Sequence, residues 1–188
     1  MQTRMGLTST AHFTCLGGTR DELRQWLHQA HAAGISNIMA LRGDPPAGAV
    51  NFSHVPGGLR HANELVELIR REFPQFGIGV AGYPEKHPEA SSLETDLDYL
   101  KQKVDTGADA VYTQLFYDNS RFWAFRDRYD RAGLRVPLVP GIMPILNFAQ
   151  IKRITQMCGA FLPPELSRQL ERSEEHTSEL QSPYVISY

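Results

Sequence analysis

The chain has 188 residues and a mass of 21.2 kDa, with 41% apolar and 21% charged residues. This composition is typical of one globular domain, or of part of a larger one, and excludes disordered, collagen-like and coiled-coil chains. The 19 basic and 21 acidic side chains leave a formal charge of −2 without any basic block, so we expect no nucleic-acid partner. No apolar run approaches the ~20 residues that cross a bilayer, so we expect no membrane partner. Two cysteines without a C-x-x-C spacing favour free thiols in a cytoplasmic protein.

Short apolar runs alternate with amphipathic helical segments along the chain. A short apolar run between turn residues is typical of a buried parallel strand. The capping box at Thr19–Glu22 predicts the start of the first helix, and Gly34 predicts its end. The predicted strands are 12–16, 37–41, 78–81, 110–115 and 136–142, and the later predicted helices are 65–73, 91–107, 119–132 and 148–158.

Five β-α units in succession predict an α/β fold with a parallel sheet and helical crossovers. Two architectures fit this pattern: an open doubly wound sheet, or a (β/α)8 TIM barrel. A whole barrel takes ~250 residues, so a barrel formed by this chain would be incomplete. Residues 172–188 are polar and show no apolar stripe. We therefore confine the folded domain to residues 1–171 and expect 172–188 to be an unrelated or disordered tail, an artefact of the sequence.

Two formal motif matches do not predict sites. Gly77–Gly82 matches G-x-G-x-x-G, but it lies within a predicted strand and is followed by Tyr83-Pro84, whereas a dinucleotide loop must open a helix. His28 and His31 share a helix face without a third ligand nearby, so we expect no metal site.

Polar side chains gather after the predicted strands. They include His12, the Arg42–Asp44 turn, Tyr83, His87 and Gln114. Taken singly, each has an ordinary explanation: Arg42 could pair with a nearby carboxylate, Asp44 could cap a turn, and Tyr83 could fill the core. Taken together, they indicate a site for a large ligand with anionic and heteroaromatic parts, because ligands bind on loops that a rigid scaffold positions.

Several of these stretches resemble the methylenetetrahydrofolate reductase family. They are HFTC (12–15), NIMALRGDPP (37–46), VAGYPEKHPEA (80–90), GAD followed by TQLF (107–116) and PLVPGIMPI (137–145), in the family's order. The resemblance implies an incomplete (β/α)8 TIM barrel of about five β-α units, the third to seventh strands of the family's barrel. It also implies non-covalent FAD and the reduction of 5,10-methylenetetrahydrofolate to 5-methyltetrahydrofolate by NADH or NADPH, in folate metabolism and methionine supply.

The resemblance assigns roles to particular residues. Gln114 would contact the folate. Asp44 would be catalytic, because a carboxylate beside the flavin disfavours its anionic reduced form and stabilises a cation developing on the folate. The implied FAD contacts are His12, Arg42, Gly43, Asp44, His61, Ala62, Tyr83, His87, Pro88, Glu89, Ala90, Asp96 and Lys103.

The resemblance also implies that the parent enzyme is a homo-oligomer and that its general-acid glutamate lies on a strand outside this chain. We therefore expect this chain alone to be unstable and inactive. Two other hypotheses remain: a truncated product with at most residual flavin binding, and a β/α-barrel enzyme of another class that binds phosphate near strands seven and eight.

Overall fold

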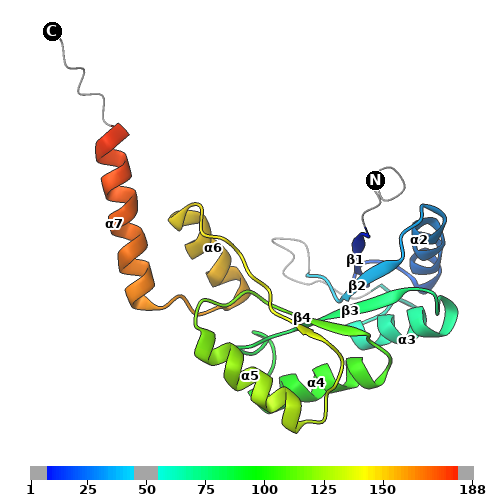
Figure 1. The fold of residues 1–188 in the computed structure, drawn as a ribbon. Coiled ribbons are helices and arrows are strands. Elements are labelled where there is room, and N and C mark those ends of the chain that lie inside the picture. The colour runs from blue at the N-terminus through cyan, green and yellow to red at the C-terminus, as the bar shows by residue number, and fades with distance from the viewer. Residues whose placement is uncertain (1–7, 45–54, 182–188) are drawn as a thin grey trace.

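The computed structural model describes residues 8–44 and 55–181. Strands and helices alternate from β1 to α6, and a longer helix, α7, follows (Figure 1). The strands are β1 (Thr10–Thr14), β2 (Asn37–Leu41), β3 (Gly77–Gly82), β4 (Ala110–Thr113) and β5 (Leu138–Val139). The helices are α2 (Arg20–Ala32), α3 (Ala62–Glu72), α4 (Leu93–Asp105), α5 (Asn119–Arg131), α6 (Phe148–Cys158) and α7 (Pro164–Gln181).

The strands form one parallel sheet in the order β1-β2-β3-β4-β5. A doubly wound sheet reverses its strand order at a switch point. The sheet of the described residues has no such reversal, so that alternative is wrong. The predicted α/β class with a parallel five-stranded sheet is confirmed.

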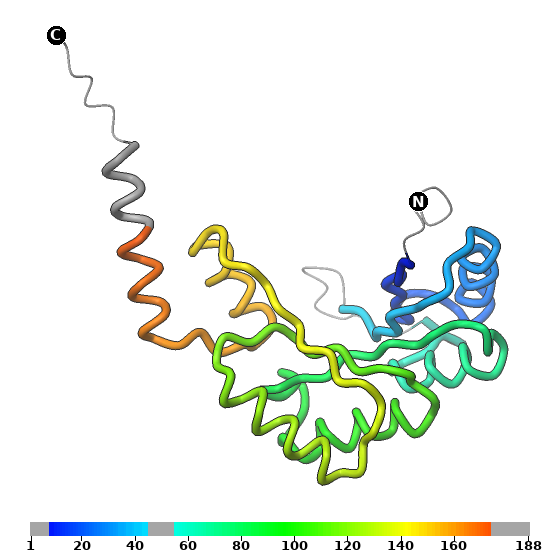
Figure 2. Tube along the Cα trace, viewed as in Figure 1, coloured from blue at the N-terminus to red at the C-terminus, as the bar shows by residue number. Residues whose placement is uncertain are grey.

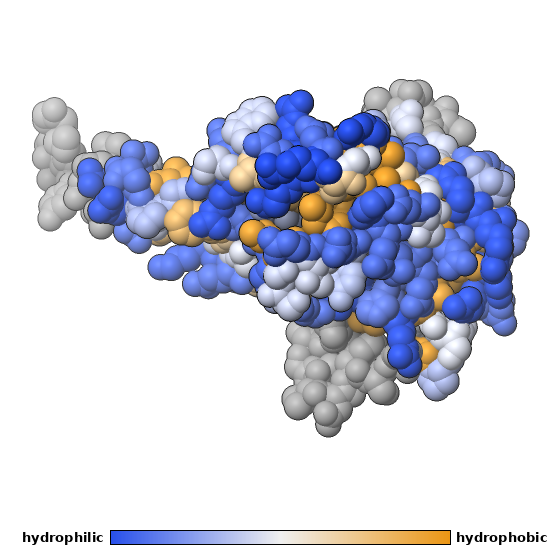
Figure 3. All heavy atoms as spheres, turned by 90° about the horizontal axis from the view of Figure 1, so that it is seen from below, coloured by the Kyte–Doolittle hydropathy of each residue, from blue (hydrophilic) through white to orange (hydrophobic). Residues whose placement is uncertain are grey.

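Helices α3, α4 and α5 lie along one side of the curved sheet, as the path of the chain shows (Figure 2). The core lies between them and the strands, where Ile38, Val80 and Val111 are fully buried. The outer surface of these helices is largely hydrophilic, with smaller apolar areas (Figure 3). This amphipathic arrangement is what the helical periodicity predicts.

Gly79 explains why a glycine motif lies inside a strand. A Cβ at this position would lie 2.8 Å from Tyr112 Cε2, so only glycine allows β3 and the Tyr112 ring on β4 to approach this closely. The prediction that Gly77–Gly82 does not open a helix is therefore confirmed, since these residues are β3 itself.

Strand β5 is shorter than predicted. It comprises Leu138–Val139 instead of the expected 136–142. Pro137 and Pro140 flank it, and proline has no N–H to donate to a neighbouring strand. The apolar run therefore pairs with β4 over two residues only.

Helix α7 continues to Gln181 and extends away from the sheet (Figure 1). The expected disorder is therefore not seen in residues 172–181, and residues 182–188 lie outside the described part of the chain. Residues 172–181 contain Glu, Leu and Gln, which favour helix even without an apolar stripe. That residues 172–188 are unrelated to the rest of the chain stays a prediction. Among the described residues, no helix is long and apolar enough to span a membrane.

The predicted capping box opens α2. Thr19 Oγ1 accepts the Glu22 N–H at 3.3 Å, and Glu22 Oε2 accepts the Thr19 N–H at 2.8 Å. We expect Thr19→Ala to lower the free energy of unfolding by about 1 kcal/mol, because it leaves an amide at the helix start without its acceptor. Urea denaturation measures this loss. Gln25→Ala, on the exposed surface of the same helix, is the control, and equal stability of the two variants would contradict the prediction.

Candidate functional site

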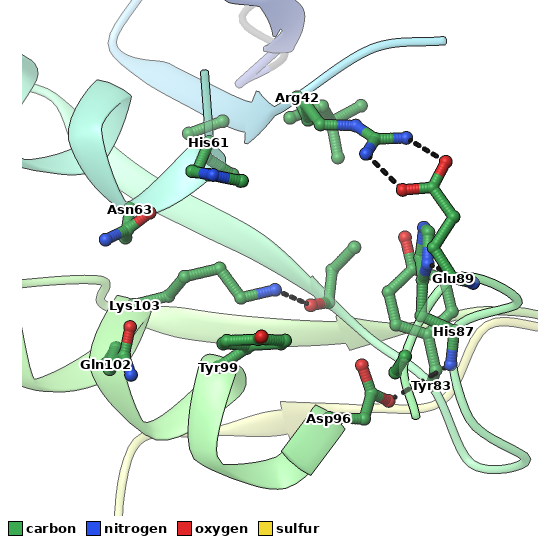
Figure 4. A pocket seen from close by; sticks show the side chains of 15 residues that line it. Arg42, His61, Asn63, Tyr83, His87, Glu89, Asp96, Tyr99, Gln102 and Lys103 are labelled. Atoms are coloured by element: carbon green, nitrogen blue, oxygen red, sulfur yellow. Dashed lines mark hydrogen bonds and ion pairs between the residues drawn. The ribbon is translucent and has the colours of Figure 1, made fainter. Parts of the chain in front are cut away.

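A cavity of about 410 Å³ lies at the carboxyl ends of β2 and β3, between the start of α3 and one face of α4 (Figure 4). Its volume is within the ~300–1,000 Å³ range of small-molecule sites. Its lining combines cations, carboxylates, imidazoles and two phenol rings. The lining residues are Ala40, Leu41, Arg42, His61, Ala62, Asn63, Ala81, Tyr83, His87, Glu89, Ala90, Asp96, Tyr99, Gln102 and Lys103.

The structure brings most of the predicted FAD contacts together in this cavity. They come from segments separated by up to 61 positions in the chain, from Arg42 to Lys103. The nine that line it are Arg42, His61, Ala62, Tyr83, His87, Glu89, Ala90, Asp96 and Lys103.

Four predicted contacts, His12, Gly43, Asp44 and Pro88, do not line the cavity. His12 is exposed on β1, and its neighbours Ala11 and Phe13 pack toward the core, so His12 faces the other side of the sheet. The other three lie in turns beside lining residues.

The Arg42–Asp44 turn depends on its glycine. Gly43 has φ +86°, and a Cβ there would lie 2.9 Å from Thr14 Cβ on β1. Asp44, next in the chain, is exposed. Its charge reaches Tyr83, whose pKa rises to about 12 through burial first and then through the charges of Asp96 and Asp44. Asp44 therefore acts electrostatically on the same edge of the cavity.

Arg42 is paired with Glu89 at one end of the cavity (Figure 4). Arg42 Nη2 donates to Glu89 Oε1 at 2.8 Å, and Nη1 donates to Oε2. The two-bond pairing raises the pKa of Arg42 and lowers that of Glu89. The alternative that Arg42 pairs with a carboxylate is thus realised, and Arg42 does not face the cavity as an unpaired cation.

Lys103 provides the second cation. Its Nζ donates to the Ala81 carbonyl oxygen at 2.6 Å. Burial lowers the pKa of Lys103 to about 8, and the nearby charge of Asp96 opposes this shift only in part. An anion in the cavity would stabilise the protonated amine.

Asp96 links α4 to the loop after β3. One of its carboxylate oxygens accepts the His87 N–H at 3.2 Å, and burial raises the pKa of Asp96. The Tyr83 and His87 rings meet edge to face, with their centroids 4.8 Å apart. These contacts order the loop that carries Glu89 beside the cavity.

Cys15 joins three segments behind the cavity. Its buried thiol donates to the Arg42 carbonyl at 3.6 Å and to the His61 carbonyl at 3.7 Å. Burial, chiefly, raises the pKa of Cys15 to about 11, so the group is a neutral donor. Cys15 and Cys158 are both free thiols, which confirms that prediction.

Gln114, the predicted folate contact, lies outside the main cavity. It follows β4, and its N–H donates to the Gly82 carbonyl at 2.8 Å. It lines a smaller neighbouring cavity, and Tyr83 lines both. The two cavities therefore share one tyrosine as their common wall.

Three polar lining residues were not predicted: Asn63, Tyr99 and Gln102. Asp96, Tyr99 and Lys103 occupy positions i, i+3 and i+7 of α4, which is one helix face. This spacing could have identified Tyr99 once Asp96 and Lys103 were chosen. Asn63 follows His61-Ala62 directly and had no comparable signal.

Comparisons with known proteins identify the family of the chain. The family model "Methylenetetrahydrofolate reductase" matches residues 1–185. Methylenetetrahydrofolate reductase 2 of Saccharomyces cerevisiae is 40% identical over 173 residues, which cover 90% of this chain and 29% of that protein. The 5,10-methylenetetrahydrofolate reductase of Salmonella typhimurium is 43% identical over 168 residues, which cover 89% of this chain and 54% of that protein. The chain thus spans about half or less of the length of these relatives.

A solved structure shares the fold at low sequence identity. Phosphoenolpyruvate phosphomutase from Streptomyces platensis subsp. rosaceus superposes with a TM-score of 0.50 and 14% identity, covering 96% of this chain and 75% of that one. This likeness concerns the fold alone. The family-model match over nearly all of the sequence shows that the chain belongs to the methylenetetrahydrofolate reductase family.

Proposed function

We propose that this chain is the flavin-binding part of an enzyme that reduces 5,10-methylenetetrahydrofolate to 5-methyltetrahydrofolate, with FAD as its cofactor and NADH or NADPH as its electron donor. The observation that carries the proposal is the cavity at the ends of β2 and β3, where nine of the implied FAD contacts meet. Relatives that share 40–43% of the aligned residues bear the name of this reductase.

The five strands are, in this proposal, consecutive strands of a (β/α)8 barrel. Their sequential order and the helices α3, α4 and α5 along one side support it, because a barrel keeps its strands in order with the helices outside. The cavity lies at the carboxyl ends of the strands, which is where barrel enzymes bind their ligands.

The residues present fit FAD along the length of the cavity. Tyr83, His87 and Arg42 lie at one end, and Asn63 and Gln102 lie at the other (Figure 4). In this proposal the residues at the first end, beside the Arg42–Asp44 turn, would hold the isoalloxazine ring, and those at the second end would hold the adenosine. Lys103 lies between the two ends, and its ammonium group would pair with the pyrophosphate.

Bound FAD supplies the hydride chemistry, and the protein supplies orientation and electrostatic field. Asp44 holds a fixed negative charge beside the ring-binding end and stabilises positive charge that develops on the folate. Tyr83 stays a neutral phenol at physiological pH, because its pKa is about 12. Gln114 orients the folate through the NH₂ group of its side-chain amide, because the amide oxygen already accepts the Leu115 N–H.

Tyr99 tests where the adenosine lies. Its ring is exposed in the free protein and lines the cavity beside Lys103. We expect Tyr99→Ala to weaken FAD binding about tenfold, because stacking of a base on an aromatic ring contributes about 1–3 kcal/mol. Quenching of flavin fluorescence measures the affinity. Trp123→Ala removes an equally exposed ring on α5, outside the cavity, and should leave the affinity unchanged; equal losses would argue against this placement.

Flavin binding and turnover separate the proposed reductase from a flavin-binding product without activity. FAD binding by the 188-residue chain, together with NADH or NADPH oxidation coupled to folate reduction in a full-length relative, supports the proposed function. A full-length relative that binds FAD but reduces no folate would contradict it.

A further inference from the structure

Glu85 has a buried carboxylate with one unsatisfied oxygen. Its side chain is only 8% exposed. Oε2 accepts the Phe161 N–H at 2.5 Å and lies 3.7 Å from Arg121 Nη1. Oε1 is buried and has no hydrogen-bond partner among the described residues. A buried carboxylate oxygen without a hydrogen-bond donor lowers the stability of the fold, so a donor bound at this position would be stabilising.

The backbone around Glu85 is held in an unusual conformation. Lys86, the next residue, has φ +94°, which is rare for a residue other than glycine. The Lys86 N–H donates to the Tyr83 carbonyl at 3.3 Å and closes the turn after β3. The turn and the Phe161 N–H together hold Glu85 against the segment that follows α6.

Glu85 and Gln114 line the same small cavity, which has a volume of about 10 Å³. By this measure it accommodates about one water molecule. Gln114 Oε1 already accepts the Leu115 N–H at 3.0 Å, so the amide is oriented with its NH₂ group as the remaining donor. Two residues of the cavity wall therefore carry an unsatisfied acceptor, Glu85 Oε1, and a remaining donor group, Gln114 Nε2.

We propose that Glu85 is a positioning residue for Gln114, acting through one water molecule in this cavity. The water accepts a hydrogen bond from Gln114 Nε2 and donates one to Glu85 Oε1. The bridge fixes the rotation of the amide and leaves its second N–H for an acceptor atom of the folate heterocycle. This last step rests on the proposed function of Gln114.

Amide NMR of Gln114 in the whole 188-residue chain tests the bridge directly. In the unsubstituted chain we expect cross-relaxation between the Gln114 Nε2 protons and a bound water. Glu85→Leu keeps most of the side-chain volume but no oxygen, so it should abolish this signal and shift the Gln114 amide resonances. Glu85→Gln retains an acceptor oxygen and should preserve both. Glu67→Gln, on the exposed surface of α3, is the control.

Binding of 5-methyltetrahydrofolate to the FAD-loaded chain tests the positioning role. We expect Glu85→Leu to weaken this binding about tenfold, the loss typical of one hydrogen bond, and Glu85→Gln to restore it, with FAD affinity unchanged in both. Unchanged Gln114 resonances in Glu85→Leu, or no bound-water signal in the unsubstituted chain, would overturn the bridge. Equal folate affinity in Glu85→Leu would overturn the positioning role. Absence of folate binding in the unsubstituted chain, with the NMR result as expected, would refute the proposed folate contact of Gln114 and leave the bridge standing.

Discussion

Asp44→Asn should retain FAD binding and lower the rate of folate reduction by a factor of about 10²–10³, the loss seen when one preorganised electrostatic group is removed from an active site. Asparagine has nearly the same shape but no charge. The turn that carries it stays intact because Gly43 supplies its positive φ. Asp44 lines neither cavity, so its contribution to FAD affinity is small.

The two half-reactions separate this effect. The substitution is made in a full-length relative with the same Leu-Arg-Gly-Asp turn, and rapid mixing follows flavin reduction by NADH or NADPH and then flavin oxidation by 5,10-methylenetetrahydrofolate. We expect the rate of flavin oxidation by the folate to fall far more than the rate of flavin reduction. The matched control is Asp127→Asn, on the exposed surface of α5, in a relative that also has an aspartate at this position. Unchanged folate reduction in Asp44→Asn would remove Asp44 from the mechanism.

Lys103→Met should stabilise the free chain while weakening its affinity for FAD. The folded structure lowers the pKa of Lys103 from 10.5 to about 8, so a charged amine costs stability at neutral pH. Each pKa unit corresponds to about 1.4 kcal/mol of stability. The variant also loses the hydrogen bond to the Ala81 carbonyl, which lowers its stability by about 1 kcal/mol. We therefore expect a net increase of about 2 kcal/mol in the free energy of unfolding at pH 7.

The stability gained by Lys103→Met depends on pH. Between about pH 8 and 10.5 the unfolded chain holds the Lys103 proton and the folded chain does not, so the unsubstituted chain gains stability as pH rises. The advantage of Lys103→Met therefore shrinks across that window. Urea denaturation at pH 7 and at pH 10 measures the difference in free energy of unfolding between the two chains. A difference that is the same at both pH values would contradict the lowered pKa of Lys103 as its cause.

FAD affinity should respond in the opposite direction. Loss of a charge-assisted hydrogen bond to the pyrophosphate weakens binding about 10- to 100-fold at pH 7. Binding to the unsubstituted chain should itself weaken as pH rises through about 8, because the free protein loses the Lys103 proton there. Binding to Lys103→Met should be flat over this range.

Local signals in the sequence predict much of the fold. The capping box at Thr19 and the stop at Gly34 lie next to the helix that they delimit, and the structure places both as expected. The prolines around β5 also lie in the sequence, but the apolar run there favours a strand longer than the one that forms. The helix through residues 172–181 had no apolar stripe to indicate it.

Pairings between distant residues explain what could not be predicted at the site. The partner of Arg42 is Glu89, 47 positions away, and the partner of Glu85 is the Phe161 amide, 76 positions away. Periodicity carries no information on such pairs. The family resemblance supplied nine of the residues that line the cavity, and helical spacing from Asp96 and Lys103 could have added Tyr99.

Titration of the folded 188-residue chain with FAD, followed by flavin fluorescence, tests the central claim most directly. The account predicts saturable binding of one FAD per chain that Lys103→Met and Tyr99→Ala both weaken and Trp123→Ala does not. A folded chain that binds no FAD, or one whose affinity is the same in all three variants, would contradict it.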